Sequence, residues 1–364
     1  MGAYSNWLKK QALSSVTQPL SSKVDSNEES YLDAEGFEKL GWRHFRRRVQ
    51  FGLSGQQKYL RNEIDPSWKK ALWVYKGIPQ IGDTLMDLAP RSLLSQRGLH
   101  VDLYTDSHLA AMFTDDPWLG QVYDDPREVA AQNYDFVIVP SHKNRSLHHK
   151  TQLLPHLSWV SMHCFYTGPE FHRGKFGAQR IIDLLGDKTA ELEFALHQQQ
   201  KLRPLIKPAN DGRGHSKIAI ALGGVDAART YNHWLALAEK LFQSDNKIEL
   251  TLVGSSNAIE IGQMFVSQFS KRQRIVNLVN KTNITECRNL INQQDLLIAA
   301  DGGLMHLGAT TSTKLISLFH KKVDPQWRLS GTHLQSCLQS STLAVSDIAV
   351  DAIVKTCLSV LVQP

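Results

Sequence analysis

The segment Asp295-Leu296-Leu297-Ile298-Ala299-Ala300-Asp301-Gly302-Gly303-Leu304-Met305-His306 decides the fold. Its first half is a short apolar run, typical of a buried parallel strand, and two glycines and a helical pattern follow at once. A strand that passes through a glycine turn into a helix is the repeating unit of a Rossmann-like sheet. The segment therefore predicts an α/β fold with a ligand at the carboxyl end of this strand.

The same alternation extends outward through most of the chain. In the second half we expect strands at 217–222, 249–253, 275–278, 295–300 and 315–319, and helices at 234–242, 259–269, 284–292 and 345–361. In the first half we expect strands at 71–75, 101–104 and 136–139, a helix that follows Asp83 and ends at Leu94, and a helix at 178–185. This alternation predicts mostly parallel sheets covered by helices.

The chain length agrees with a division into two domains, since 364 residues is about twice a typical domain. The polar segment 198–216, with Pro204, Pro208, Gly212 and Gly214, predicts the linker. We expect Rossmann-like domains at 71–197 and 217–364 that face each other across a cleft. Residues 1–70 form an N-terminal extension outside this pattern.

The extension has two parts. Residues 1–35 are polar and lack a sustained period, which predicts a loosely ordered arm. From about 38 to 60 the pattern is helical, with Trp42, Phe45, Val49 and Leu53 beside four arginines between 43 and 48. This helix either lies on a membrane surface or packs on the first domain with a solvated basic face. In the first case Trp7, Leu8, Trp42 and the arginines would contact anionic lipid.

Composition excludes several classes of protein. With 42% hydrophobic and 21% charged residues, the chain is neither collagen-like nor disordered, and no apolar run approaches the ~20 residues that span a bilayer. Four separated cysteines without zinc spacing favour reduced thiols in the cytoplasm, and the N-terminus lacks the pattern of a secretory signal. A net charge of +6 favours anionic partners: nucleotides, phosphorylated glycolipids or nucleic acid.

The turn after the strand at 295–300 carries the main candidate site. Backbone N–H groups at Gly302 and Gly303 open a helix, where they suit a diphosphate. Asp301 would accept hydrogen bonds from ribose hydroxyls or cap the helix, and His306 would face the ligand or the strand beneath. The alternative is an ordinary capping aspartate, a tight glycine turn and a core histidine.

These residues resemble a family. The runs 277–282 and 295–309, the later segments 318–320 and 324–327, and Gln80-Ile81-Gly82-Asp83 upstream are similar to the heptosyltransferase family, glycosyltransferase family nine. The likeness extends from Ala71 to the C-terminus. It implies a GT-B fold and inverting, metal-independent transfer of a sugar from a nucleotide-sugar to a lipopolysaccharide or lipooligosaccharide core acceptor. It also implies a peripheral enzyme at the cytoplasmic face of the bacterial inner membrane, with ADP-heptose as donor, no other cofactor and no nucleic-acid partner.

The resemblance also implies residue roles. Domain 71–197 would bind the acceptor, with Asp83 as catalytic base. Lys143 and Arg145 would be the acceptor ligands, in a basic loop with His142, His148, His149 and Lys150 nearby. The alternatives are a helix-capping Asp83 and a solvated loop. Domain 217–364 would bind the donor through Gly223, Gly224, Arg229, Lys281, Thr282, Asp301, Gly302, Gly303, Leu304 and His306. Lys281 and Thr282 could instead be ordinary turn residues. No Asp-x-Asp pair occurs, so helix N–H groups and basic side chains would meet the leaving-group charge.

Three positions depart from the family pattern. Arg229 stands where the family has a phosphate-binding Lys, Asn257 and Glu260 stand near the place of its ribose-binding Glu, and Gly302 replaces a Ser or Thr. The donor sugar is therefore left open between heptose and a hexose on another nucleotide. The remaining alternative is a non-catalytic basic protein on the same fold that binds a membrane surface or nucleic acid. Dehydrogenase and hydrolase motifs are absent from the sequence.

Overall fold

A computed structural model describes residues 3–168, 170–187, 189–207, 214–269 and 274–362. The chain divides into two compact units, residues 1–203 and 204–364. The division falls inside the expected linker, of which residues 208–213, with Pro208 and Gly212, lie outside the described residues. The expected domain bounds stay predictions.

The first unit contains a five-stranded parallel sheet. Its strands are β1 (Lys70–Tyr75), β2 (His100–Thr105), β3 (Val122–Tyr123), β4 (Phe136–Val139) and β5 (Ser158–Ser161), in the order β3-β2-β1-β4-β5. Its helices are α4 (Ile81–Asp87), α5 (Arg91–Gln96), α6 (Ser107–Phe113), α7 (Pro126–Ala130), α8 (Asn144–Leu153), α9 (Arg173–Leu185) and α10 (Leu192–Gln198). The continuous helix expected up to Leu94 was wrong: Pro90 separates α4 from α5, because proline lacks the N–H that a helix interior needs.

The second unit contains a six-stranded parallel sheet. Its strands are β6 (Ser216–Ala221), β7 (Ile248–Val253), β8 (Ile275–Asn277), β9 (Leu296–Ala300), β10 (Lys314–Phe319) and β11 (Cys337–Gln339), in the order β11-β10-β9-β6-β7-β8. Its helices are α11 (Trp234–Ser244), α12 (Ile259–Phe269), α13 (Ile284–Asn292), α14 (Gly303–Gly308) and α15 (Val350–Val362). The last helix begins five residues later than expected, since Val345–Asp347 form a short 3-10 turn.

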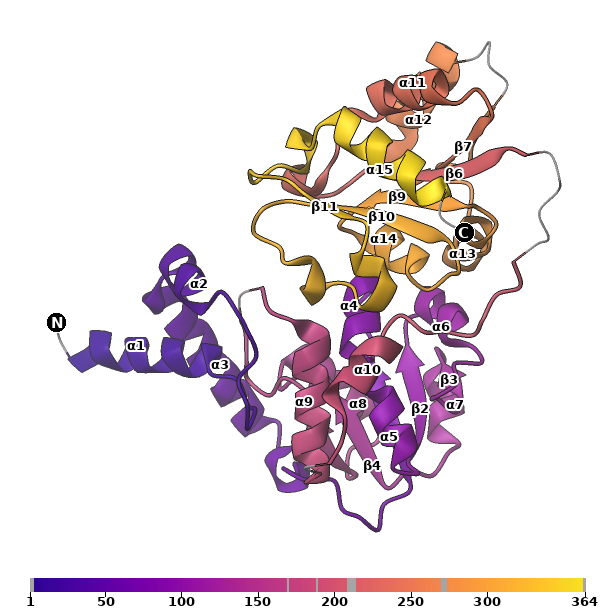
Figure 1. Ribbon diagram of the computed structural model, residues 1–364. Coiled ribbons are helices and arrows are strands. Elements are labelled where there is room, and N and C mark those ends of the chain that lie inside the picture. The colour runs from indigo at the N-terminus through magenta and orange to yellow at the C-terminus, as the bar shows by residue number, and fades with distance from the viewer. Residues whose placement is uncertain (1–2, 169, 188, 208–213, 270–273, 363–364) are drawn as a thin grey trace. The chain divides into compact units, whose positions relative to one another are not determined.

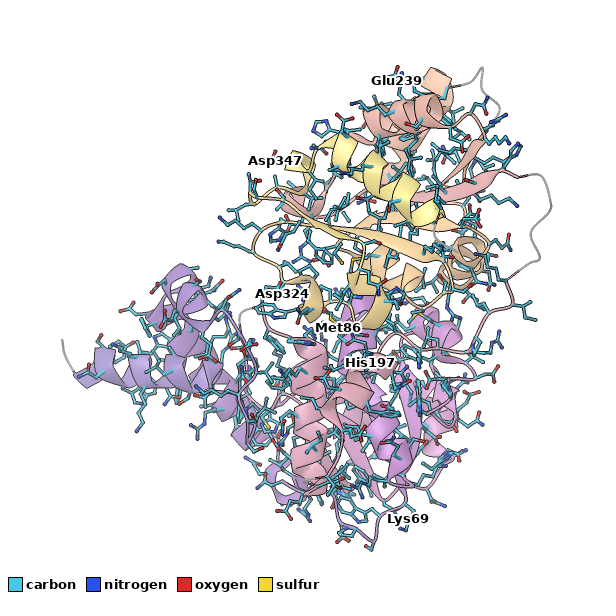
Figure 2. The ribbon with its side chains drawn as sticks, in the orientation of Figure 1. Lys69, Met86, His197, Glu239, Asp324 and Asp347 are labelled. Carbon is cyan, nitrogen blue, oxygen red and sulfur yellow. The ribbon has the colours of Figure 1, made fainter. Side chains whose placement is uncertain are left out.

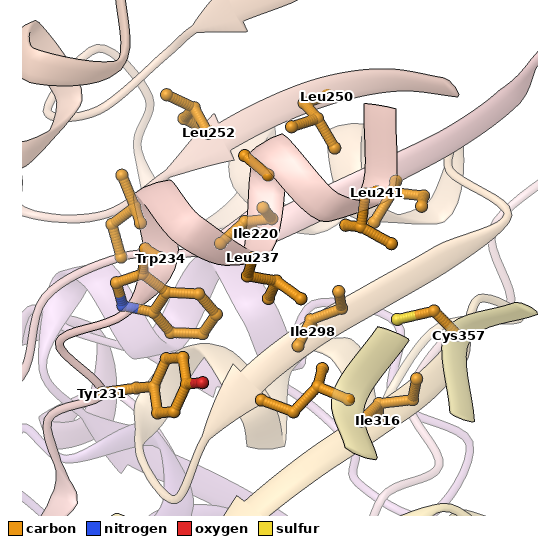
Figure 3. Packing of buried hydrophobic residues seen from close by; sticks show 14 of the residues in the cluster. Ile220, Tyr231, Trp234, Leu237, Leu241, Leu250, Leu252, Ile298, Ile316 and Cys357 are labelled. Carbon is orange, nitrogen blue, oxygen red and sulfur yellow. The ribbon is translucent and has the colours of Figure 1, made fainter. Parts of the chain in front are cut away.

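The core of the second unit follows from the register of its central strands. Ile298 pairs with Ile220 on one side and with Ile316 on the other, so three isoleucines form a row across the sheet. Trp234 of α11 and Cys357 of α15 pack against this cluster, and all five side chains are buried (Figure 3). Burial of such side chains is the main favourable contribution to folding.

Helices make up most of residues 3–53 of the N-terminal extension, and residues 54–69, with one 3-10 turn, connect them to β1. The extension contains α1 (Ala3–Val16), α2 (Glu28–Glu35) and α3 (Phe37–Leu53), so the loosely ordered arm expected for residues 1–35 was wrong (Figure 1). Helix α1 lies against α3, where Leu8 is buried and Gly41 permits close approach: a Cβ at Gly41 would lie 2.4 Å from the Leu8 carbonyl oxygen. Polar composition concealed α1, because its apolar stripe is narrow and needs α3 as a partner.

Helix α3 has two different faces. Its inner face packs on the first unit, where Phe51 stacks on His142 with ring centroids 4.7 Å apart and His44 meets the edge of Phe165. Its outer face leaves Trp42 47% and Leu53 84% exposed. The helix therefore packs on its domain, as one alternative expected, and also presents apolar side chains to solvent. In the described part of the chain no helix has the length and apolar character to cross a membrane.

Candidate active site

Strand order defines one switch point in each unit. The chain winds in opposite directions from β1 and β4 in the first unit, and from β6 and β9 in the second. Ligands of open parallel sheets bind beyond the carboxyl ends of the strands at such points. In the first unit this end lies toward Met86 of α4, whereas Lys69, which precedes β1, marks the opposite end (Figure 2). The predicted residues that follow these four strands therefore lie where a ligand is expected.

Asp83 lies in the first turn of α4, just beyond β1. The capping position belongs to Gln80, so the alternative of a helix-capping aspartate was wrong. The Asp83 side chain is 36% exposed, and its Oδ2 lies 3.6 Å from a guanidinium nitrogen of Arg173 at the start of α9. Both the cation and the positive end of the helix favour the ionised carboxylate. An accessible, ionised carboxylate is suited to act as a base.

A buried network fixes Arg173 in this position. Its guanidinium donates to both carboxylate oxygens of Asp87, at 2.7 and 3.0 Å, and the Tyr75 hydroxyl donates to Asp87 at 2.8 Å. Burial by itself would raise the pKa of Asp87, but Arg173 and His163 outweigh it and hold that pKa well below its usual range. Burial and Asp87 together raise the pKa of Tyr75, so the hydroxyl stays protonated and donates. The sequence pattern did not reveal Arg173.

Lys143 and Arg145 follow β4, the other strand at this switch point. A Cβ at Gly77, in the loop after β1, would lie 3.2 Å from Cδ of Arg145, so this side chain lies over the loop that leads to Asp83. Lys143 has an exposed side chain. Nevertheless, desolvation by the surrounding protein, and then repulsion from Arg47, Arg173 and Arg145, lower its pKa to about 8. The structure thus brings both predicted acceptor residues toward the Asp83 loop.

Two residues near this basic loop, Lys150 and His142, have structural roles. Lys150 is fully buried, and its Nζ donates to Oε1 of Gln56 and to the carbonyl of Pro155. His142 is packed among aromatic rings, and burial lowers its pKa to about 4, so it carries no charge near neutral pH. Neither is available to an acceptor. This part of the basic-loop expectation was wrong, since residue type does not reveal burial.

Asp301 follows β9 and is the centre of the second switch point. Its Oδ2 lies 3.6 Å from Nη1 of Arg229, which follows β6, and 3.5 Å from Nε of Arg328, which follows β10. Gly302 occupies the capping position of α14, so the capping alternative for Asp301 was wrong. Arg229 also lies 3.6 Å from a carboxylate oxygen of Asp226. Two guanidiniums converge on the buried Asp301, and guanidinium is a group that suits phosphate ligands. Arg328 was missed, although it directly follows the segment 324–327 that carried the resemblance.

The glycines of this unit differ in what they permit. Gly223 has φ +90°, and a Cβ there would lie 2.9 Å from Oδ1 of Asn257; the amide of Asn257 in turn donates to the Gly224 carbonyl at 2.9 Å. Gly302 has extended backbone with φ 177°, and the nearest atom to a Cβ there is 3.8 Å away. Gly223 is therefore required by its turn, whereas Gly302 leaves open space in which a ligand can approach the backbone. Gly303 is exposed and Leu304 half-buried beside it.

His306 lies in α14 and is buried, as the core-histidine alternative expected. Burial lowers its pKa to about 4, against an opposite influence of Asp301, so the ring is neutral. Its Nδ1 is buried without a hydrogen-bond partner among the described residues. A neutral imidazole can donate or accept one further hydrogen bond at this position.

Lys281 and Thr282 lie farther along the sheet. They follow β8, which β6 and β7 separate from β9. Nζ of Lys281 donates to the Asn277 carbonyl at 2.9 Å, and Thr282 precedes a capping box formed by Asn283 and Glu286 at the start of α13. The described contacts do not join either residue to Asp301. Their assignment to the donor site stays a prediction.

Metal ligands do not gather at either switch point: the described residues contain no group of three or more histidine, cysteine, aspartate or glutamate side chains able to hold an ion.

The chain is similar in sequence to one family of enzymes and in structure to several solved proteins. Residues 176–345 match the model described as glycosyltransferase family 9 (heptosyltransferase). The glycosyl transferase family 9 protein of Veillonella parvula DSM 2008 is similar over 84% of this chain and 100% of its own, with 12% identity and a TM-score of 0.61. ADP-heptose lps heptosyltransferase II of E. coli is similar over 81% and 99%, with 16% identity and a TM-score of 0.59. E. coli heptosyltransferase WaaC with ADP is similar over 80% and 99%, with 16% identity and a TM-score of 0.59. No curated protein sequence matches the chain.

These structures establish the fold. The predicted GT-B class, with two Rossmann-like domains and an N-terminal helical extension, is confirmed. The matched residues include the segment from Asp295 to His306 that carried the resemblance. The roles of individual residues stay predictions. The match over residues 176–345, together with the shared fold, identifies the chain as a glycosyltransferase that is similar over that part of its length to family 9, the heptosyltransferases.

Proposed function

We propose that this glycosyltransferase moves a heptose or a hexose from a nucleotide-sugar to a lipopolysaccharide or lipooligosaccharide core acceptor, with inversion and without a metal ion. The observation that carries the proposal is the contrast between the two switch points. One presents an accessible carboxylate held beside Arg173, and the other presents two guanidiniums around Asp301. The first suits deprotonation of a hydroxyl, and the second suits binding of a diphosphate.

In this mechanism Asp83 is the general base. Its carboxylate takes the proton of the acceptor hydroxyl while that oxygen forms a bond to the anomeric carbon. The bond between the anomeric carbon and the diphosphate oxygen breaks on the opposite side, which inverts the configuration. Arg173 keeps Asp83 ionised and oriented, since its own position is held by Asp87.

Positive charge and backbone donors stabilise the leaving diphosphate. Arg229 and Arg328 supply guanidiniums, which match phosphate geometry, and the N–H groups that follow Asp301 supply further donors. Asp301 orients both arginines and remains available to ribose hydroxyls. We assign the donor as ADP-heptose on the family resemblance. E. coli heptosyltransferase structures with ADP and with an ADP-fluoroheptose share the fold.

On the acceptor side we propose that Lys143 and Arg145 bind anionic groups of the lipid A–core glycolipid. Such an acceptor lies in a membrane, so we infer a peripheral enzyme at the cytoplasmic face of the bacterial inner membrane. The exposed Trp42 and Leu53 on α3 support this inference, because aromatic and apolar side chains flanked by arginines suit an anionic lipid surface.

The test combines donor binding with transfer. We expect ADP-heptose to raise the melting temperature of the protein more than UDP- or GDP-sugars do. Asp83→Asn should retain this shift but lower kcat by about 10²–10⁴-fold, because the base is lost. Asp33→Asn, at an exposed position on α2, is the matched control and should change neither. An Asp83→Asn enzyme with nearly normal kcat would refute the assigned base, and a larger shift with a UDP-sugar would instead identify a hexose-type donor.

The family match favours this enzyme over the non-catalytic anion-binding alternative. Nucleotide-sugar binding without transfer to any core acceptor would restore that alternative.

A further inference from the structure

The arginines of α3 point in different directions. Successive residues of an α-helix are rotated by about 100°, so Arg47 shares a face with His44 and Phe51, three residues before it and four after it. His44 and Phe51 are buried against the first unit, and Arg47 itself is half-buried. Arg46 and Arg48 are exposed. Within the arginine run, Arg47 therefore lies on the face toward the first unit, whereas Arg46 and Arg48 lie on the solvent side.

The face that carries Arg47 is docked beside the acceptor loop. Phe51 stacks on His142 at 4.7 Å with 5° between the ring planes, and Lys143 is the next residue. The edges of Phe165 and Trp159 complete the contact around Phe51. These rings leave α3 little freedom to shift. Arg47, one helical turn before Phe51, is therefore held on the side of Lys143.

The cations here outnumber the carboxylates that face them. Besides burial, repulsion from Arg47, Arg173 and Arg145 lowers the pKa of Lys143. Asp87 opposes them at Lys143 but is already bonded to Tyr75 and Arg173, and Asp83 lies 3.6 Å from Arg173. On its other sides Arg47 faces Arg43, Arg46 and Tyr31, and burial and these cations lower its pKa. Such a cluster is relieved by an anionic ligand.

We propose that the N-terminal extension completes the acceptor site, with Arg47 joining Lys143 and Arg145 to bind a phosphate or carboxylate group of the acceptor. The inference rests on the proposed function for the identity of the acceptor, but the anion site itself does not. Arg47 lies in the part of the chain that the resemblance did not cover, so the extension adds an acceptor contact to the Rossmann-like domain.

The test compares neighbouring arginines in the full-length protein. Arg47→Gln should raise the Kd for a lipid A glycolipid bearing the Kdo core sugars about tenfold, because a charge-assisted hydrogen bond is lost. With the glycolipid presented in neutral detergent micelles, Arg48→Gln, the matched control on the exposed side, should change it less than twofold, because no anionic membrane surface is present for Arg48 to contact. Arg47→Lys should restore most of the affinity. The nucleotide-induced shift in melting temperature should be the same in all variants, which shows that the donor site is intact.

Two further arms separate the possible outcomes. Binding of the glycolipid without its lipid A phosphates distinguishes the two possible ligands of Arg47. If Arg47 binds a phosphate, Arg47→Gln should no longer weaken the binding of this glycolipid; if it binds a sugar carboxylate, the effect should persist. Stabilisation of the wild type by inorganic phosphate, lost in Arg47→Gln but kept in Arg48→Gln, supports the anion site even if the glycolipid does not bind, and then the proposed acceptor is what fails. Equal effects of Arg47→Gln and Arg48→Gln, or none from either, would overturn the inference.

Discussion

Two carboxylates one turn apart on α4 have different roles, because burial separates them. Asp83 is accessible beside Arg173, whereas Asp87 is buried and bonded to Tyr75 and Arg173. The folded pKa of Asp87 lies below its unfolded value. Its contribution to stability is therefore fully present above about pH 4 and is lost only as the pH falls through the folded pKa.

Asp87→Asn should destabilise the protein by about 3 kcal/mol, because it leaves the Arg173 guanidinium without its buried counter-charge. Asp83→Asn should change stability much less, since its side chain is partly solvated. Urea unfolding at neutral pH measures both values. Equal loss of stability in the two variants would contradict the division of roles.

As a proposed acceptor ligand, Lys143 should make acceptor binding depend on pH. Its pKa is lowered to about 8, so the cation is present at pH 7 and is lost as the pH rises through this value. We expect kcat/KM for the acceptor to fall above about pH 8 in the wild type. Lys143→Arg should abolish this fall, because guanidinium stays charged throughout the range. The ratio of the two profiles is the measurement, and a ratio independent of pH would exclude Lys143 as the group responsible.

The two glycine turns of the second unit differ in whether their backbone conformation requires glycine. Gly223→Ala should cost about 1–3 kcal/mol, since it places a side chain at φ +90° and within 2.9 Å of Oδ1 of Asn257. Gly302→Ala should leave the melting temperature unchanged, because its backbone is extended and its surroundings are open.

The same two glycine variants also test the donor site. The added methyl group at Gly302 would project into the space expected for the diphosphate, so Gly302→Ala should weaken nucleotide binding without loss of stability. Thermal melting with and without ADP separates the two effects. Unchanged nucleotide binding in Gly302→Ala would remove Gly302 from the donor site.

For the whole molecule, the prediction concerns the outer face of α3, which we propose as the membrane contact. Trp42→Ser combined with Leu53→Ser should reduce co-sedimentation with phosphatidylglycerol vesicles by about tenfold, because interfacial apolar area is lost. Leu343→Ser, at an exposed position of the second unit, is the control. Point variants are preferable to deletion of the extension, which would remove the buried Phe51. Unchanged vesicle binding would refute α3 as the membrane contact.

The class of fold and of enzyme can be predicted from local patterns in the amino-acid sequence. Apolar runs of strand length, each followed by a turn and a helical pattern, predict parallel α/β units, and the run from Asp295 to His306 carries the family resemblance. These signals are local, since they depend on hydrophobic period and on turn chemistry within a few residues. For the same reason the helix expected at 284–292 agrees with α13, whose capping box lies in the sequence itself.

Which side chains meet depends on tertiary packing. Strand order brings Arg229 and Arg328, which lie about a hundred residues apart in the chain, to the same carboxylate of Asp301. Packing of Phe51 on His142 places α3 beside the loop that contains Lys143. Packing also buries His142 and Lys150, which the sequence placed near the basic acceptor loop, and orders α1 against Gly41 of α3. The physical reason is that proximity across a sheet and desolvation depend on neighbours distant in the chain, whereas residue type and spacing describe only the local segment.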